Sequence, residues 1–119
     1  MSTGPQELRD RTKAFAVRIV KLYRSLPRTA DAQVVGRQLL RCGTSVAANY
    51  RAACRGRSRA EWIAKIGLVV EEADETVFWI EMLSDCDIVS SERCKDTLKE
   101  ACELSAIFTA SRHTARKAS

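Results

Sequence analysis

Apolar residues recur along the first half of the chain with the spacing of one face of an α-helix. The first stripe alternates steps of four and three residues through Leu8, Thr12, Phe15, Ile19, Leu22 and Leu26. The second repeats this spacing through Val35, Leu39, Cys42, Val46, Asn49 and Ala53. Pro27 interrupts the pattern between the two stripes, because proline disrupts a helix interior. The pattern therefore predicts two consecutive amphipathic helices.

Two further stripes occupy the second half of the chain. The third consists of Ile63, Ile66, Val70, Ala73, Val77 and Ile80. The fourth consists of Leu98, Ala101, Leu104, Ile107 and Phe108. Ser58 and Glu61 form a capping box before the third stripe, and Ser90 or Ser91 is expected to open the fourth helix. Asp31 is expected to cap the second helix and Gly56 to end it.

Four amphipathic helices joined by short connections favour one architecture. We predict an all-α, up-down-up-down antiparallel four-helix bundle, with helices at about 5–26, 31–55, 58–86 and 91–114. The chain has 119 residues, which suits one core, so residues 1–119 are expected to form a single domain.

The third helix carries a second apolar stripe outside its inner one. Trp62, Val69, Thr76 and Leu83 follow one another at steps of seven residues. Trp79 lies about 180° from Val70 around the helix, and Leu68 is on the same outer side. An apolar face left in water marks an interface. We therefore expect a homo-oligomer whose contacts include Trp62, Leu68, Val69, Thr76, Trp79 and Leu83.

One polar residue falls on a predicted inner stripe. Asn49 is expected in the core of the second helix, where a single buried amide can fix the register of a bundle. Buried amides need hydrogen-bond partners, and Asp74 is the candidate partner on the third helix.

The cysteines argue against a metal site or a disulfide framework. Cys42, Cys54, Cys86, Cys94 and Cys102 are odd in number and include no CxxC pair. Those separated by eight residues would lie about 12 Å apart along a helix, too far to share a metal ion. We expect reduced thiols, no metal and no cofactor. The sequence also lacks an apolar run long enough to cross a membrane and a visible signal peptide, which predicts a cytoplasmic protein.

The net charge of +5 is unevenly distributed. Residues 31–60 hold six arginines against Asp31 alone, whereas residues 61–90 hold Lys65 against eight acids. The outer face of the second helix carries Arg37, Arg41, Arg51 and Arg55, and Arg57 and Arg59 continue the basic run. Arginine suits phosphate geometry, so these six residues are candidate contacts to a nucleic-acid backbone. Ion pairs between subunits and an ordinary solvated surface are the alternatives.

The acids of the third helix do not resemble a catalytic site. Glu71, Glu72 and Glu75 fall away from the predicted inner face, and no histidine, serine or lysine completes a recognisable constellation. We expect a protein that is not an enzyme.

Residues 42–75 resemble the hallmark region of a known family. The segment Ser45-Val46-Ala47-Ala48-Asn49, followed by Ser58, Glu61 and Trp62, is similar to the four helix bundle protein family, small bacterial proteins also described as 23S rRNA-intervening sequence proteins. Accessory proteins of diversity-generating retroelements are relatives of this family. This chain has Ala47 where many members have proline, and Tyr50-Arg51-Ala52-Ala53 where many have Ile-Ala-Glu-Gly. The resemblance implies a homopentameric bundle with a basic surface that binds nucleic acid.

These observations favour a non-enzymatic, homo-oligomeric bundle that binds the backbone of DNA or RNA with little sequence specificity. An accessory role in an RNA-containing or reverse-transcriptase-containing machine would make a reverse transcriptase a further partner. The alternative is a protein–protein adaptor that uses its basic and acidic faces without nucleic acid.

Overall fold

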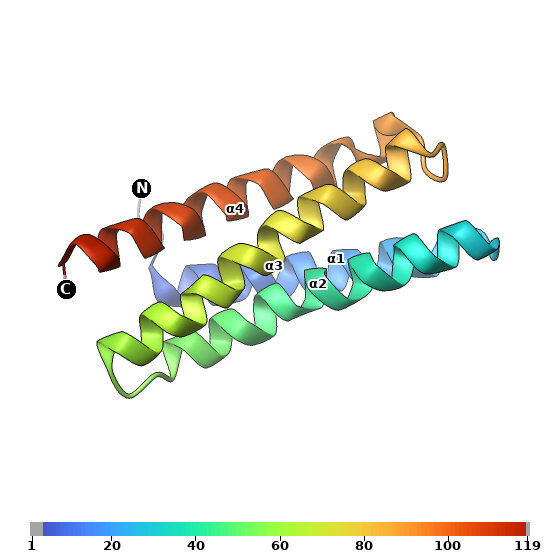
Figure 1. The fold of residues 1–119 in the computed structure, drawn as a ribbon. Helices are drawn as coiled ribbons and strands as arrows, with labels where there is room; N and C mark the ends of the chain where they lie inside the picture. The colour runs from blue at the N-terminus through green and yellow to red at the C-terminus, as the bar shows by residue number, and fades with distance from the viewer. Residues whose placement is uncertain (1–3, 119) are drawn as a thin grey trace.

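The computed structural model describes residues 4–118 as four α-helices, with no strand in that range. The helices are α1 Pro5–Arg24, α2 Ala30–Cys54, α3 Arg59–Asp85 and α4 Ser91–Ala118. Consecutive helices run in opposite directions and pack side by side (Figure 1). The expected all-α bundle is therefore confirmed. Helix ends lie within two residues of the expected positions, except that α4 continues to Ala118 instead of ending near residue 114.

Side-chain caps fix where two of the helices, α3 and α4, begin. The Ser58 hydroxyl accepts a hydrogen bond from the Glu61 N–H (3.1 Å), as the capping box predicts. Ser90 accepts from the Arg93 N–H (3.2 Å) and opens α4. The N-cap of α2 is Thr29 and not Asp31, because the helix begins one residue earlier than expected. Asp31 lies in the first turn, where hydrogen bonds from the Thr29 side chain and the Ala32 N–H lower the pKa of its carboxyl.

Two glycines of α2 let α1 approach closely. A Cβ atom on Gly43 would lie 2.9 Å from Cγ1 and 3.0 Å from Cγ2 of Ile19, which is completely buried. A Cβ on Gly36 would lie 2.6 Å from Cδ1 of Leu26. Cβ atoms do not approach other atoms this closely, so an added methyl group would force a shift. At Gly36 the end of the flexible Leu26 side chain could move, whereas at Gly43 the contact is with the branched, buried Ile19 of α1. The close α1–α2 contact therefore depends chiefly on Gly43.

The core face of α3 is wider than its sequence pattern predicts. Val69, Thr76 and Leu83 were expected on an outer, oligomer-forming face, but all three are completely buried within the chain. The reason is that α3 packs against both α2 and α4, so its two stripes merge into one broad apolar face. The Thr76 hydroxyl donates to the Glu72 carbonyl (2.7 Å), which satisfies the buried polar group. These three residues therefore belong to the core.

The expected polar core pair is also corrected. Asn49 is only half-buried and Asp74 is exposed, so they form no buried contact. Tyr50 takes the core position instead, with its ring centroid 5.1 Å from that of Phe108 on α4. Helical spacing allows either a three- or a four-residue step after Val46, and the four-residue step leads inwards.

A cluster of charged groups bridges α1 and α4. These two helices contact each other much less than consecutive helices do. The Arg11 guanidinium on α1 donates from Nε and Nη2 to the two carboxylate oxygens of Glu100 on α4, at 2.8 and 2.7 Å. It also donates to Glu103, at 2.9 Å. The hydrogen bond from Arg11 lowers the pKa of Glu100, because it favours the ionised carboxylate.

None of the four described helices is both long and apolar enough to cross a lipid bilayer.

The first prediction concerns the Arg11–Glu100 pair. Arg11→Gln should lower the free energy of unfolding by about 1 kcal/mol at neutral pH, because it removes a two-bonded, partly buried ion pair. A carboxyl whose folded pKa is lowered stabilises the fold above its unfolded pKa. The difference from wild type should therefore shrink as pH falls below about 4.5, the ordinary value of Glu100. Urea unfolding at several pH values measures this, with Lys13→Gln as the control on the same helix. Equal losses in both variants would contradict the role of the pair.

The second prediction compares two glycine-to-alanine changes. Gly43→Ala should destabilise the protein by about 1 kcal/mol, because overpacking against the branched Ile19 exceeds the gain in helix propensity. Gly67→Ala is the matched control, since a Cβ there meets no atom within 4 Å. It should stabilise α3 by about 0.5–1 kcal/mol. Thermal unfolding distinguishes the two, and stabilisation by Gly43→Ala would show that α1 and α2 are not held this closely.

Candidate nucleic-acid interface

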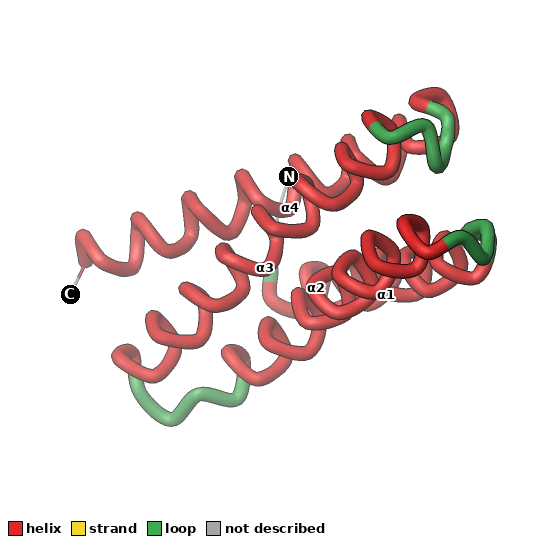
Figure 2. The backbone as a smooth tube through the Cα atoms, turned by 45° about the vertical axis from the view of Figure 1, so that its right-hand side comes forward, coloured by secondary structure: helices red, strands yellow, loops and turns green. Residues whose placement is uncertain are grey.

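The up-down topology brings four segments of the chain to the same end of the bundle. The α2–α3 loop lies at one end, and the α1–α2 and α3–α4 loops lie together at the other (Figure 2). The start of α1, the end of α2, the start of α3 and the end of α4 therefore meet at the end that holds the α2–α3 loop. Acids are scarce in these segments, since residues 5–13, 51–65 and 112–118 contain only Glu7, Asp10 and Glu61. The basic residues of the same segments, besides Arg11, are Arg9, Lys13, Arg51, Arg55, Arg57, Arg59, Lys65, Arg112, Arg116 and Lys117. We call this part of the molecule the basic end.

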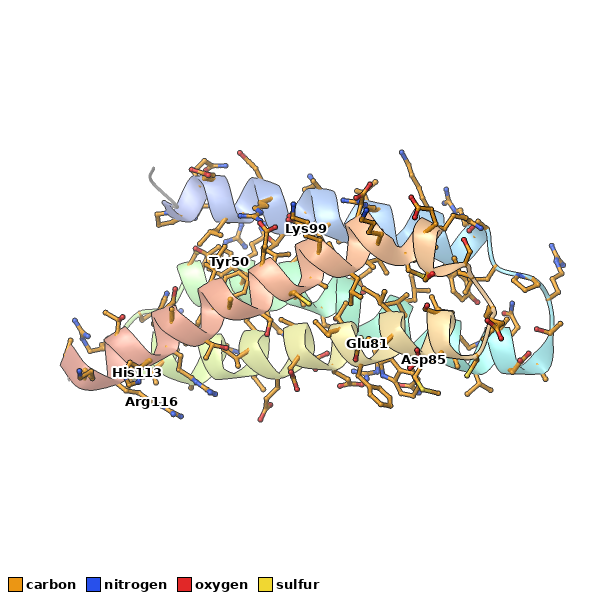
Figure 3. All side chains as sticks on the ribbon, turned by 90° about the horizontal axis from the view of Figure 1, so that it is seen from above. Tyr50, Glu81, Asp85, Lys99, His113 and Arg116 are labelled. Carbon is orange, nitrogen blue, oxygen red and sulfur yellow. The ribbon has the colours of Figure 1, made fainter. Side chains whose placement is uncertain are left out.

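The bundle is long enough to separate this end from the acids near the C-terminal end of α3. It measures 47 × 26 × 21 Å, and the Debye length is about 8 Å at physiological salt. Figure 3 shows His113 and Arg116 towards the C-terminal end of α4, whereas Glu81 and Asp85 lie on α3 towards the opposite end. Glu81 and Asp85 are therefore too distant to neutralise the basic end, whereas Glu61, at the start of α3, lies within it.

Among the six arginines proposed from the sequence, Arg51, Arg55 and Arg57 are exposed at the basic end. For these three, the structure shows no ion pair with any acid among residues 4–118. Arg37 is also exposed, but it lies nearer the start of α2 and so towards the other end of the bundle. The six arginines therefore do not form one continuous contact surface.

The other two arginines have partners within the chain. Arg41 contacts Glu72 (3.3 Å) and Glu75 on α3, and the same Glu75 carboxylate accepts from the Trp79 indole N–H (3.1 Å). Arg59 donates to the Ala115 carbonyl on α4 (3.4 Å), close to the C-terminal end of that helix. Both cations are already engaged, and Arg51, Arg55 and Arg57 have the greater capacity for a ligand.

Two cations of α1 belong to the same surface. A groove between α1 and α2, with a volume of about 730 Å³, has Arg9 and Lys13 on one wall and Arg51 and Arg55 on the other. We call it the α1/α2 groove. The sequence pattern places Lys13 on the outward face of the first helix. It does not predict that Lys13 faces the arginines of α2, because that depends on the register between the two helices.

The apolar residues expected at an oligomer interface divide into two sets. Val69, Thr76 and Leu83 are in the core, as described above. Leu68 is 43% exposed, and Trp62 and Trp79 are half-buried. The structure adds Phe78, which is 50% exposed and packs edge-to-face on Trp79 with ring centroids 4.9 Å apart. Among these sets, the large apolar side chains of α3 that stay at least partly exposed are therefore Trp62, next to α4, and Leu68, Phe78 and Trp79 further along the helix.

The cysteines are free thiols in residues 4–118, and no group of three or more potential metal ligands comes together there. Cys42 and Cys94 are buried, and burial raises the pKa of both thiols. Cys54 is half-buried and lines the α1/α2 groove, whereas Cys86 and Cys102 are exposed elsewhere.

Comparison with known proteins places the chain in a family. No curated protein matches the sequence. A crystal structure of a protein of unknown function from the S23 ribosomal protein family of Bacteroides thetaiotaomicron is 32% identical, with a TM-score of 0.84, over 92% of this chain and 97% of that one. The family model described as 23S rRNA-intervening sequence protein matches residues 6–110. This match spans all of the bundle except the last turns of α4, and the chain belongs to the 23S rRNA-intervening sequence protein family.

Proposed function

We propose that this protein is a non-enzymatic, homo-oligomeric bundle that binds the backbone of DNA or RNA with little sequence specificity. The observation that carries the proposal is the basic end, where exposed arginines of α2 and the following loop have no acidic partner in the described chain. No Asp or Glu occurs between Asp31 and Glu61. An ordinary solvated helix interleaves acids with bases, so this composition favours a polyanionic ligand.

The geometry of the arginines suits phosphate groups. Arg51 and Arg55 are four residues apart on one helix, so their guanidinium groups extend from the same face about 6 Å apart along the axis. Each guanidinium can donate two parallel hydrogen bonds to a phosphate. Such contacts position a nucleic acid without reading its bases, which is why we propose little sequence preference. The family description, which refers to 23S rRNA, is consistent with a nucleic-acid ligand. It also fits an accessory role in an RNA-containing or reverse-transcriptase-containing machine.

The acids of α3 support a function without catalysis. Glu72 and Glu75 both contact Arg41, whose positive charge offsets part of theirs. Neither acid lines the α1/α2 groove. A catalytic carboxylate needs a concave site and a shifted pKa, and the residues around Arg41 provide an ion-pair cluster instead.

The exposed aromatic surface of α3 supports self-association. Phe78, Leu68 and the half-buried Trp62 and Trp79 lie on a helix whose other sides are covered by α2 and α4. A second copy of the chain would remove these side chains from water. The family resemblance suggests a homopentamer, which would place several basic ends on one particle and multiply their contacts with a polyanion.

The third prediction tests nucleic-acid binding. Arg51→Gln combined with Arg55→Gln should weaken binding to mixed-sequence nucleic acid equally for all sequences tested, and should reduce the slope of log affinity against log salt by about 2. Fluorescence anisotropy over a salt series measures both effects. The control is Lys95→Gln with Lys99→Gln, which removes two exposed cations at the same spacing from α4. Far-UV circular dichroism should show unchanged helicity.

Two outcomes would contradict this proposal. If the α4 control loses as much affinity as the α2 variant, binding does not depend on the basic end. If the wild-type protein binds no nucleic acid even at low salt, the adaptor function becomes the better explanation, with other proteins as ligands of the basic and acidic faces.

The fourth prediction tests self-association. Light scattering at micromolar concentration should give a mass well above the 13.3 kDa of one chain. Phe78→Glu should reduce this mass without loss of helicity, because it places a charge on the exposed aromatic surface. Val17→Glu is the control, since Val17 is a similarly exposed apolar residue on α1. A wild-type monomer at this concentration would overturn the assembly model.

A further inference from the structure

The α1/α2 groove offers a more specific site than the arginines alone. Its two walls are antiparallel helices, and each contributes two cations four residues apart: Arg9 and Lys13 from α1, Arg51 and Arg55 from α2. Each wall therefore presents charges about 6 Å apart along its axis. The groove residues include a single acid, Asp10. Four cations against one acid give the groove a strong preference for anions.

Small side chains keep the groove open. Besides the cations and Cys54, α2 contributes Thr44, Ala47 and Ala48 to the lining, and none of these has a side chain long enough to fill the space between the walls. A long side chain at these positions would occupy the groove. A bulky anionic group can therefore lie between the walls with cations on both sides.

The acid in the groove is linked to one of its cations through Gln6. The Gln6 side-chain N–H donates to Asp10 Oδ1 (3.0 Å), and the Gln6 Oε1 accepts from Arg9 Nη2 (2.7 Å). Asp10 thus lies on the α1 wall without a direct ion pair to Arg9. Its charge is the unfavourable contribution to anion binding within this groove.

A second hollow lies on the other side of the same arginines. It is lined by Arg57, Glu61 and Lys65 together with Arg51 and Arg55, and its volume is about 480 Å³. Its far side is formed by the α2–α3 loop and the first turns of α3. The α1/α2 groove is larger and has a helix on each side. These differences favour the α1/α2 groove as the main site.

The lining also indicates the form of the nucleic acid. Among the residues that line the α1/α2 groove there is no Phe, Tyr, Trp or His. Proteins that bind unpaired strands stack bases on aromatic side chains, and this groove provides no such surface. In a duplex the bases are stacked on one another and the phosphates form a continuous outer ridge. A groove of cations and small residues matches that ridge.

We propose that the α1/α2 groove holds the phosphate backbone of double-stranded nucleic acid, between Arg9 and Lys13 on one side and Arg51 and Arg55 on the other. This proposal rests on the proposed function, nucleic-acid binding at the basic end, and assigns it to one groove and one class of ligand. It also adds α1 to the binding surface.

Cys54 provides a direct measure of groove occupancy. It is half-buried and lines the groove, whereas Cys86 at the C-terminal end of α3 and Cys102 on α4 are exposed outside it. The rate of alkylation by N-ethylmaleimide is measured for each thiol by mass spectrometry, with and without a saturating short mixed-sequence duplex. Alkylation of Cys54 should slow severalfold when duplex is bound, and the rates at Cys86 and Cys102 should not change. Equal rates at Cys54 with and without bound duplex would overturn the assignment to this groove.

A pair of matched variants tests the α1 wall. Arg9→Gln with Lys13→Gln should reduce the salt slope of duplex binding by about 2, as expected for two lost phosphate contacts. Lys21→Gln with Arg24→Gln removes two exposed cations from the opposite end of the same helix and should leave the slope nearly unchanged. Asp10→Asn should strengthen binding, because it removes the one negative charge of the groove. Equal effects of the two double variants would show that α1 does not form a wall of the site.

The outcomes distinguish this proposal from the proposed function. Absence of binding by the wild-type protein overturns both. Binding that is weakened by Arg51→Gln with Arg55→Gln, but not by the α1 variant, keeps the proposed function and moves the site to the α2–α3 side. A single strand of the same length that binds as tightly as the duplex and protects Cys54 equally would overturn the assignment to double-stranded nucleic acid.

Discussion

Short connections between consecutive helices are the constraint on which the rest of this structure depends. Each loop is too short to let the chain return to its starting end, so neighbouring helices must run antiparallel. This alternation converts a charge pattern along the sequence into a charge pattern in space. Three segments that are far apart in the chain come together at the basic end of the molecule. They are the start of α1, the C-terminal half of α2, which has no acid, and the last turns of α4. The candidate interface is therefore a product of topology as much as of composition.

Packing within the bundle is uneven, and the differences have separate physical origins. Between α1 and α2, the glycines at 36 and 43 permit close approach to Leu26 and Ile19. Helix α3 is buried on two sides, so more of its apolar residues lie in the core than one stripe would supply. Between α1 and α4 there are fewer contacts, and the forked Arg11–Glu100 ion pair joins the helices. Close helix approach at glycine thus contributes on the α1–α2 side, and an ion pair contributes on the α1–α4 side.

The sequence was sufficient to predict the helices and their antiparallel order, because helical spacing, proline and capping residues are local signals. It was insufficient wherever the outcome depended on how one helix lies against another. The spacing allowed either Asn49 or Tyr50 as the inward residue, and only packing against Phe108 on α4 distinguishes them. The sequence pattern assigned α3 a single inner stripe, so Val69, Thr76 and Leu83 were expected outside it. They are buried because α3 packs against two neighbouring helices and has an inner face towards each. The ion pairs of Arg41 with Glu72 and Glu75 depend on the register between α2 and α3. This register cannot be predicted from the residue pattern of either helix alone.

The sparse contact between α1 and α4 also affects how the molecule opens. Helix α1 is packed extensively against α2 alone, whereas α2 and α3 each lie between two well-packed neighbours. Separating α1 from the bundle exposes less apolar surface than separating either central helix, so it requires the smaller free energy of local unfolding. In native-state hydrogen exchange, the amides of α1 should therefore exchange before those of α2 and α3. Because α1 carries Arg9 and Lys13, each such opening event also removes one wall of the α1/α2 groove.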